Sequence, residues 1–166
     1  MEAAEESRLW RECLLPSAEQ QRCAVFSPLG EERYALGLET IYEGYLAHYG
    51  TPRLFAPSDQ DTALLLGDYL YAHGLVRVAA RRNVAAVSDL SELISLCSQL
   101  RAEKSAGDGL LWAATAALLG RGVLDEARSA LRLRGDPSAL EAAARETAGA
   151  EAVERALDEH RLRVGA

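Results

Sequence analysis

The segment between residues 31 and 49 limits most strongly what this chain can fold into. Its apolar and aromatic side chains recur at spacings of four, three, four and four residues, at Tyr34, Leu38, Ile41, Tyr45 and Tyr49. Side chains at this spacing lie on one face of an α-helix. Helix-breaking sequences, SPLG at 27–30 and GTP at 50–52, stand on either side. The sequence therefore predicts a long helix from about residue 31 to residue 49.

The composition extends this prediction to the whole chain. Apolar residues make up 49% of the 166 residues and aromatic residues only 6%, and alanine and leucine dominate the apolar fraction. Residue types that favour β-strands are therefore scarce. A chain of this length buries about two-thirds of its unfolded surface and can form a single core. We predict an all-α fold in one helical domain spanning residues 1–166.

Capping and turn residues predict where the other helices begin and end. Ser17 with Gln20, and Ser58 with Asp61, have the spacing of N-terminal caps, and Ser88 can cap a further helix. Residues 104–109 are predicted to form a loop. No segment repeats at a fixed period, and a helical-repeat array is the main alternative fold. The predicted helices span about 2–15, 17–26, 58–81, 88–103, 110–119, 124–133, 137–147 and 151–164.

Charge and cysteine content restrict the partners and the compartment. The formal net charge of −7 is spread along the chain, which argues against nucleic acid or an anionic membrane surface as a partner. The longest apolar run, at about 110–119, is shorter than the roughly 18 residues of a membrane span. The first residues are acidic and unlike a secretory signal. Cys13, Cys23 and Cys97 lack metal-binding spacing. We expect a cytoplasmic protein with reduced thiols and no transmembrane segment.

Three short motifs follow one another in the first half of the chain: ETIYE at 39–43, HYGTP at 48–52 and GDYLYA at 67–72. In type, order and spacing they resemble the trans-prenyl diphosphate synthases. That family has Asp-Asp-x-x-Asp, then Arg-Arg-Gly-x-Pro, then a helix reading Leu-x-Gly-Asp-x-Leu-x-Ala. The resemblance covers about residues 36–120 and implies a truncated isoprenoid (terpenoid) synthase-like helical bundle. The family's second Asp-rich motif has no counterpart after residue 110.

The charged positions of the family motifs are altered here. Glu39, Thr40 and Glu43 align with the three aspartates, and His48 and Tyr49 align with the two arginines. In the family these groups hold Mg²⁺ and a diphosphate, so the altered motifs predict no catalytic residue in this chain. Glu39 and Glu43 share one helix face and are weak candidates for binding a cation. The simpler interpretation is a pair of solvated carboxylates, because Mg²⁺ needs further ligands.

Gly67 and Gly74 lie two helical turns apart in one predicted helix. Glycine inside a helix costs about 1 kcal/mol relative to alanine, which indicates close helix packing at these positions. In the resembled family, this helix and the next form much of the dimer interface. Packing within the chain is the equally open alternative. The resemblance implies that these residues contact another subunit: Leu66, Gly67, Tyr69, Leu70, His73, Gly74, Leu93 and Leu96.

The retained packing motif and the lost charges together suggest a function. The resemblance implies a pseudoenzyme: a non-catalytic small, regulatory subunit of a hetero-oligomeric polyprenyl diphosphate synthase in isoprenoid biosynthesis. This chain would bind no cofactor itself. A large catalytic prenyl synthase subunit with intact Asp-rich motifs would be its partner and would supply the Mg²⁺ site. On its own, the chain is not expected to be an enzyme.

Three alternatives remain open from the sequence. The first is a stand-alone inactive homodimer that binds a prenyl lipid or another apolar metabolite. A prenyl tunnel could be lined by Leu38, Ile41, Tyr42, Tyr45 and Tyr49, although the same stripe more readily forms a core. The second is residual prenyl transfer through Glu39 and Glu43. The third is an unrelated helical interaction domain, which is favoured if Gly67 packs only within its own chain.

Overall fold

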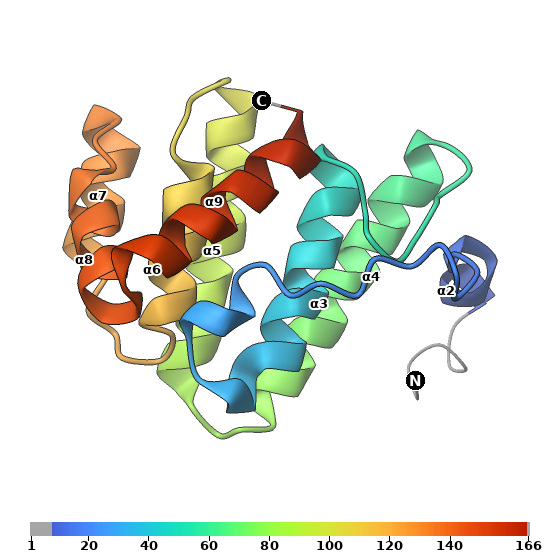
Figure 1. The fold of residues 1–166 in the computed structure, drawn as a ribbon, viewed down its shortest axis with the longest axis horizontal. Coiled ribbons are helices and arrows are strands. Elements are labelled where there is room, and N and C mark those ends of the chain that lie inside the picture. The colour runs from blue at the N-terminus through green and yellow to red at the C-terminus, as the bar shows by residue number, and fades with distance from the viewer. Residues whose placement is uncertain (1–7, 166) are drawn as a thin grey trace.

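The computed structural model describes residues 8–165. This part of the chain contains no β-strand and only an isolated antiparallel bridge between Leu14 and Phe55. The prediction of an all-α fold is therefore confirmed. The elements, shown in Figure 1, are α2 (Arg8–Cys13), the 3₁₀ turn η1 (Ser27–Leu29), α3 (Glu32–Tyr49), α4 (Gln60–Ala79), α5 (Val84–Ala102), α6 (Asp108–Ala117), α7 (Asp125–Arg134), α8 (Ser138–Ala148) and α9 (Ala150–Val164).

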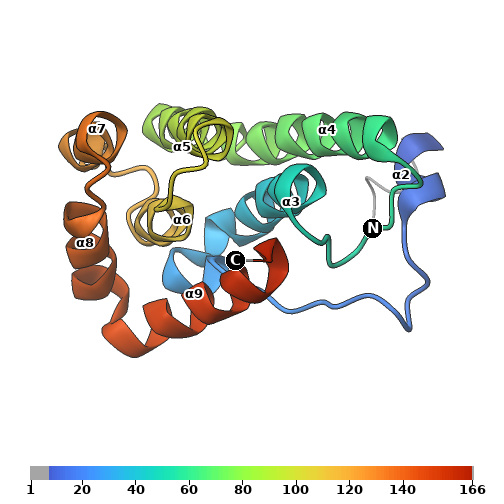
Figure 2. The same cartoon turned by 90° about the horizontal axis from the view of Figure 1, so that it is seen from above.

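The helices are arranged around α6, whose side chains are nearly all buried. In Figure 2, α4 and α5 form an outer layer along one side, α3 and α6 lie beneath them, and α9 crosses the opposite side. The α7 and α8 helices lie at one end of the molecule and α2 packs against α4 at the other. None of the helices in the described part is long and apolar enough to cross a lipid bilayer.

The predicted stripe of α3 forms the centre of the core. Tyr34, Leu38, Ile41 and Tyr45 are at most 2% exposed. The ring of Trp112 from α6 lies 5.5 Å from the ring of Tyr45, centroid to centroid. The side chains proposed to line a prenyl tunnel are therefore used in packing against neighbouring helices, as expected for a core stripe.

Helices α3 and α4 pack closely through glycines on both sides. A β-carbon on Gly74 would lie 2.3 Å from Cγ1 of Ile41 and 2.8 Å from the carbonyl oxygen of Gly37. A β-carbon on Gly44 would lie 2.8 Å from the carbonyl oxygen of Gly67. These distances are too short for any side chain, so the glycines let the two backbones approach. The unusual glycines of α4 are thus explained by contacts within the chain.

The predicted helix at 17–26 is wrong. Residues 20–24 have no regular structure, and the backbone N–H groups of Val25, Phe26 and Ser27 donate to the carboxylate of Glu39 instead of to a preceding turn. Gln20 does not complete a capping box, because its side-chain amide donates to the carbonyl of Leu15. A tertiary acceptor has replaced the local hydrogen bonds that a helix would need.

Two further helix starts differ from the prediction. Helix α5 begins four residues earlier than expected because Asn83, not Ser88, is its N-cap: Asn83 Oδ1 accepts from the N–H of Ala86 at 3.2 Å. Helix α6 begins at Asp108, inside the segment predicted to be a loop. The other bounds agree with prediction within two residues, and the part of the predicted first helix before residue 8 lies outside the described residues.

Candidate functional site

Glu39, aligned with the first aspartate of the resembled motif, projects from α3 toward the segment before η1. Its Oε1 accepts hydrogen bonds from the backbone N–H groups of Val25, Phe26 and Ser27 at 3.0, 3.1 and 2.8 Å. Its Oε2 accepts from Nη1 of Arg53 at 2.7 Å. Both carboxylate oxygens are thus engaged by groups of the same chain.

Glu43, one turn further along α3, is 1% exposed and binds the same arginine. Its Oε2 accepts from Nε of Arg53 at 2.9 Å, and its Oε1 accepts from the backbone N–H groups of Arg53 and Leu54 at 2.6 and 2.7 Å. Burial opposes the charge of Arg53, but the two carboxylates outweigh it and raise the pKa of the guanidinium. Glu39, Glu43 and Arg53 therefore form a buried clamp that ties two loops to α3.

The clamp changes how the two glutamates are interpreted. They are neither the solvated pair nor the open pair of oxygen ligands that the sequence suggested, because Arg53 and five backbone N–H groups occupy their oxygens. Within residues 8–165, no group of three or more His, Cys, Asp or Glu side chains is placed to hold a metal ion. Arg53 was missed from the sequence, although an arginine directly after the Gly-Thr-Pro turn is a visible signal.

The other altered motif positions point elsewhere. The hydroxyl of Thr40 donates to the carbonyl of Leu36 in its own helix. His48 faces α4, where its Nε2 lies 3.3 Å from a carboxylate oxygen of Asp68 and burial lowers its pKa. Tyr49 faces α5 and donates to Oγ of Ser98 at 3.3 Å. The structure therefore does not bring the five positions together in one site.

The predicted subunit-contact residues divide into two groups. Tyr69 and His73 are partly exposed, and their rings lie 6.0 and 6.4 Å from the ring of Trp10 on α2. The other members are buried within this chain and are not accessible to a partner docking on the folded structure. These are Leu66, Gly67, Leu70, Gly74, Leu93 and Leu96.

A different side of the same two helices is exposed. Leu65 and Val76 on α4 are 61% and 68% exposed, and Val84 at the start of α5 is 84% exposed. Helical spacing puts Leu65, Ala72, Val76 and Ala79 on one stripe, opposite the glycines. Figure 2 shows no other helix over this outer side. On α5 the corresponding stripe is made of small, exposed residues: Ser88, Ser91 and Ser95. We call the exposed stripes of α4 and α5 the outer face.

Comparison with known proteins gives no match: no family model fits the sequence, and no curated protein or solved structure is significantly similar to it. The resemblance to prenyl diphosphate synthases therefore rests on the short motifs, and the arguments about function rest on the geometry of this chain.

Proposed function

We propose that this protein is a non-catalytic helical subunit that acts by binding a larger protein through the outer face of α4 and α5. The observation that carries this proposal is the exposed apolar stripe of α4, with Leu65 61% and Val76 68% exposed. Single exposed apolar residues are common on protein surfaces, but an exposed apolar stripe, interrupted by Asp68 and lying beside a row of small residues, favours a helix-binding surface. The partner proposed is the catalytic subunit of a polyprenyl diphosphate synthase.

The buried clamp supports the non-catalytic part of the proposal. A catalytic Asp-rich motif needs carboxylates that are free to bind metal ions and a diphosphate. Here the aligned Glu39 and Glu43 are held by Arg53 and by backbone N–H groups. Releasing them would leave the buried Arg53 and Glu43 and the partly buried Glu39 without their charged partners, which is costly. Residual prenyl transfer through these glutamates is therefore disfavoured.

The charges beside the apolar stripe favour a partner helix with complementary charges at its two ends. Asp61 and Asp68 lie on the stripe toward the beginning of α4, whereas Arg81 and Arg82 follow its end. A partner helix with basic residues at one end and acidic residues at the other would match both ends. The partner subunit would then cover Leu65, Ala72 and Val76.

The test is co-expression of the tagged chain with an Asp-rich prenyl synthase from the same source. We expect the catalytic chain to be retained and the pair, but neither chain alone, to elongate isopentenyl diphosphate. A Leu65→Glu/Val76→Glu variant should lose at least tenfold in retained partner with an unchanged circular dichroism spectrum. The matched control is Leu162→Glu, which alters a leucine that is 80% exposed on α9 and should retain the partner. Retention that is equal in both variants, or absent in the wild type, would contradict the proposal.

A homodimer is the second candidate, and the same charge pattern favours it. The residues toward the beginning of α4 are acidic and those after its end are basic. In two copies related by a twofold axis, the acidic end of one α4 would therefore lie opposite the basic end of the other. Light scattering would then give twice the mass of the chain for the wild type. The mass would be that of one chain for Leu65→Glu/Val76→Glu. The contacts of Gly67 and Gly74 with α3 are also those expected of a helical interaction domain unrelated to prenyl synthases.

A further inference from the structure

A second feature lies on the other side of the core, between the segment joining α5 to α6 and the last helix. A cavity of about 610 Å³ opens there. Its walls come from the end of α5, the connecting residues 104–107, the first turn of α6 and the last two turns of α9. The volume falls within the roughly 300–1,000 Å³ range of small-molecule sites. The cavity is separate from both the buried clamp and the outer face.

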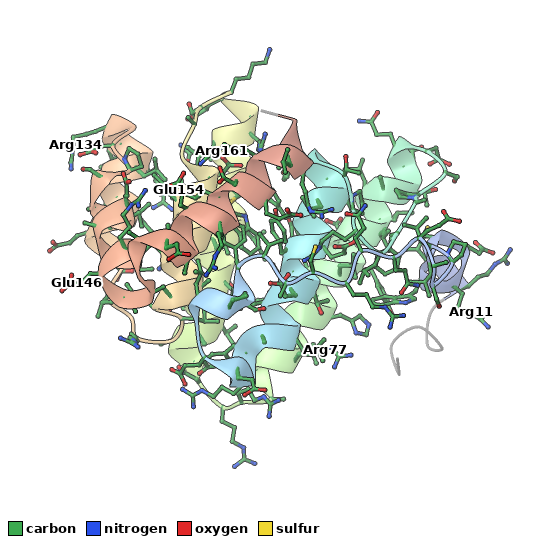
Figure 3. The ribbon with its side chains drawn as sticks, in the orientation of Figure 1. Arg11, Arg77, Arg134, Glu146, Glu154 and Arg161 are labelled. Atoms are coloured by element: carbon green, nitrogen blue, oxygen red, sulfur yellow. The ribbon has the colours of Figure 1, made fainter. Side chains whose placement is uncertain are left out.

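The polar lining of this cavity is mainly cationic. Arg101, Lys104 and Arg161 line it, together with His160 and a single carboxylate, that of Asp108. Arg161 also forms ion pairs with acidic side chains of its own helix, and its Nη2 lies 2.9 Å from Oε1 of Glu154. Both residues, Glu154 and Arg161, are labelled on α9 in Figure 3. The chain as a whole has a net charge of −7, so this cluster of cations is a local exception.

The carboxylate of Asp108 is bound by three neighbours, all through Oδ2. Its Oδ2 accepts from Nη2 of Arg101 at 2.6 Å and from the hydroxyl of Tyr45, and Nε2 of His160 lies 3.2 Å away. Burial alone would raise the pKa of Asp108, but hydrogen bonds from His160 and Tyr45 and the charge of Arg101 outweigh it and hold the pKa well below its usual range. Asp108 is therefore ionised and acts as an internal counter-ion.

This network also fixes the positions of two cavity-lining groups. Because the ionised Asp108 can only accept, Nε2 of His160 carries a proton, and Nδ1 lies within hydrogen-bond distance, 3.0 Å, of the hydroxyl of Tyr42. Arg101 is held by Asp108 and by the hydroxyl of Tyr45, to which its Nε donates at 2.8 Å. Its Nη1 makes no hydrogen bond within residues 8–165, and Arg101 is one of the residues that line the cavity.

Lys104 supplies a second cation that is not neutralised. It makes no ion pair with any residue of the described part of the chain, and it is the only lysine in the sequence. The remaining walls are apolar and include Leu100, Leu110, Leu157 and Val164. The cavity thus combines two available cationic groups with a hydrophobic wall.

We propose that this cavity binds a small anionic amphiphile. Its carboxylate or phosphate group is bound by Arg101 and Lys104, and a short hydrocarbon tail packs against Leu100, Leu157 and Val164. Arg101, held in place in advance, gives a directional contact to the anion, whereas Lys104 contributes charge. This site does not depend on the outer face, so it can be tested on the isolated chain and can fail or succeed independently of the proposed function.

The single lysine allows a direct test. Reductive ¹³C-methylation labels Lys104, and titration with octanoate and with octyl phosphate should shift its methyl resonance with saturation. Titration calorimetry should give matching affinities. Acetate or inorganic phosphate, which lack the tail, and octanol, which lacks the charge, should each bind at least tenfold more weakly. The stronger of the two amphiphiles identifies the preferred head group.

Two variants separate the site from nonspecific binding. Lys104→Gln should weaken the binding of the preferred amphiphile about tenfold in calorimetry, because a charge-assisted contact is lost. Arg121→Gln, at an exposed arginine following α6 that does not line the cavity, should change it less than twofold. An absent resonance shift, an equal effect of the two substitutions, or equal affinity for octanol would overturn the proposal.

Discussion

Arg53 shows how one residue can connect segments that are far apart in the sequence. Its guanidinium joins Glu39 and Glu43 of α3 to the carbonyl of Cys23 in the preceding loop. One positive charge faces two carboxylates, and the backbone N–H groups that also bind them supply the remaining compensation. Buried charged side chains are tolerated only when they are paired in this way. Removing any one of the three charged residues should therefore destabilise the fold strongly.

The first prediction concerns this clamp. Arg53→Met should lower the free energy of unfolding by about 3–5 kcal/mol, because the buried carboxylate of Glu43 and the partly buried carboxylate of Glu39 lose their counter-ion. Urea denaturation followed by circular dichroism measures the change. The control is Arg33→Met, which removes an exposed pair with Glu31 and should cost less than about 1 kcal/mol. Similar losses in the two variants would show that the clamp does not stabilise the fold.

The second prediction concerns pH. The pKa of Asp108 is lowered in the folded protein, so its charged form adds stability above the unfolded pKa of about 4. This contribution is lost as the pH falls toward the folded-state pKa. Asp108→Asn should therefore be less stable than the wild type by about 2 kcal/mol near neutral pH. The difference should shrink as the pH falls below about 4.

Urea denaturation at several pH values between about 3 and 7 provides the measurement, since this range spans the unfolded pKa of aspartate. Asp158→Asn is the control, because its carboxylate forms an exposed pair with Arg161 and should contribute less than about 1 kcal/mol. A constant difference between Asp108→Asn and the wild type across the pH range would contradict the assignment.

At the scale of elements, the residue at which a helix starts depends on which candidate N-cap also forms hydrogen bonds with distant segments. Asn83 caps α5 and also donates from Nδ2 to the hydroxyl of Tyr34 at 2.9 Å and to the carbonyl of Gly120 at 3.2 Å. It thereby joins the beginning of α5 to α3 and to the end of the α6 region. Ser88 has the right chemistry for a cap but lies exposed within α5. Local sequence could not rank the two residues, because the deciding contacts come from distant segments.

The third prediction compares these two caps. Asn83→Ala should destabilise the protein by about 1–2 kcal/mol, through loss of the cap and of two tertiary hydrogen bonds. Ser88→Ala should leave stability unchanged or raise it by up to about 0.5 kcal/mol, since alanine is the better helix former. Thermal unfolding of both variants under the same conditions is the measurement. A larger loss in Ser88→Ala would support the cap predicted from the sequence.

At the scale of the whole molecule, the buried apolar residues form two clusters of unequal size. The large one includes Trp112 and extends over helices α3 to α9. The small one, made of Cys13, Phe55, Leu66 and Leu70, attaches α2 and the loop before α4 to the side of α4. Trp10 packs against this small cluster, with its ring 4.8 Å from that of Phe55. Regions with few buried contacts open at lower free energy than the main core.

The fourth prediction uses the two tryptophans as separate reporters. In Trp112→Phe, the fluorescence of Trp10 should change at a lower urea concentration than the circular dichroism signal, because α2 detaches first. In Trp10→Phe, the fluorescence of Trp112 should follow the circular dichroism signal, because both report the main core. Coincident transitions in Trp112→Phe would mean that the two clusters unfold as one unit.

The sequence by itself determined the helical class and most helix bounds of this protein. The stripe of α3 and the limits of α7, α8 and α9 depend on side-chain periodicity and turn residues, which act over a few positions. The tertiary structure decided what the polar residues do. The segment predicted as a helix at 17–26 ends differently because the N–H groups of Val25 and Phe26 donate to Glu39, and Glu43 became a partner of Arg53. Asp108 and His160, 52 positions apart, meet only because α6 and α9 pack together. A hydrogen-bond partner that is distant in sequence leaves no local pattern, so the sequence could predict the helices but not these contacts.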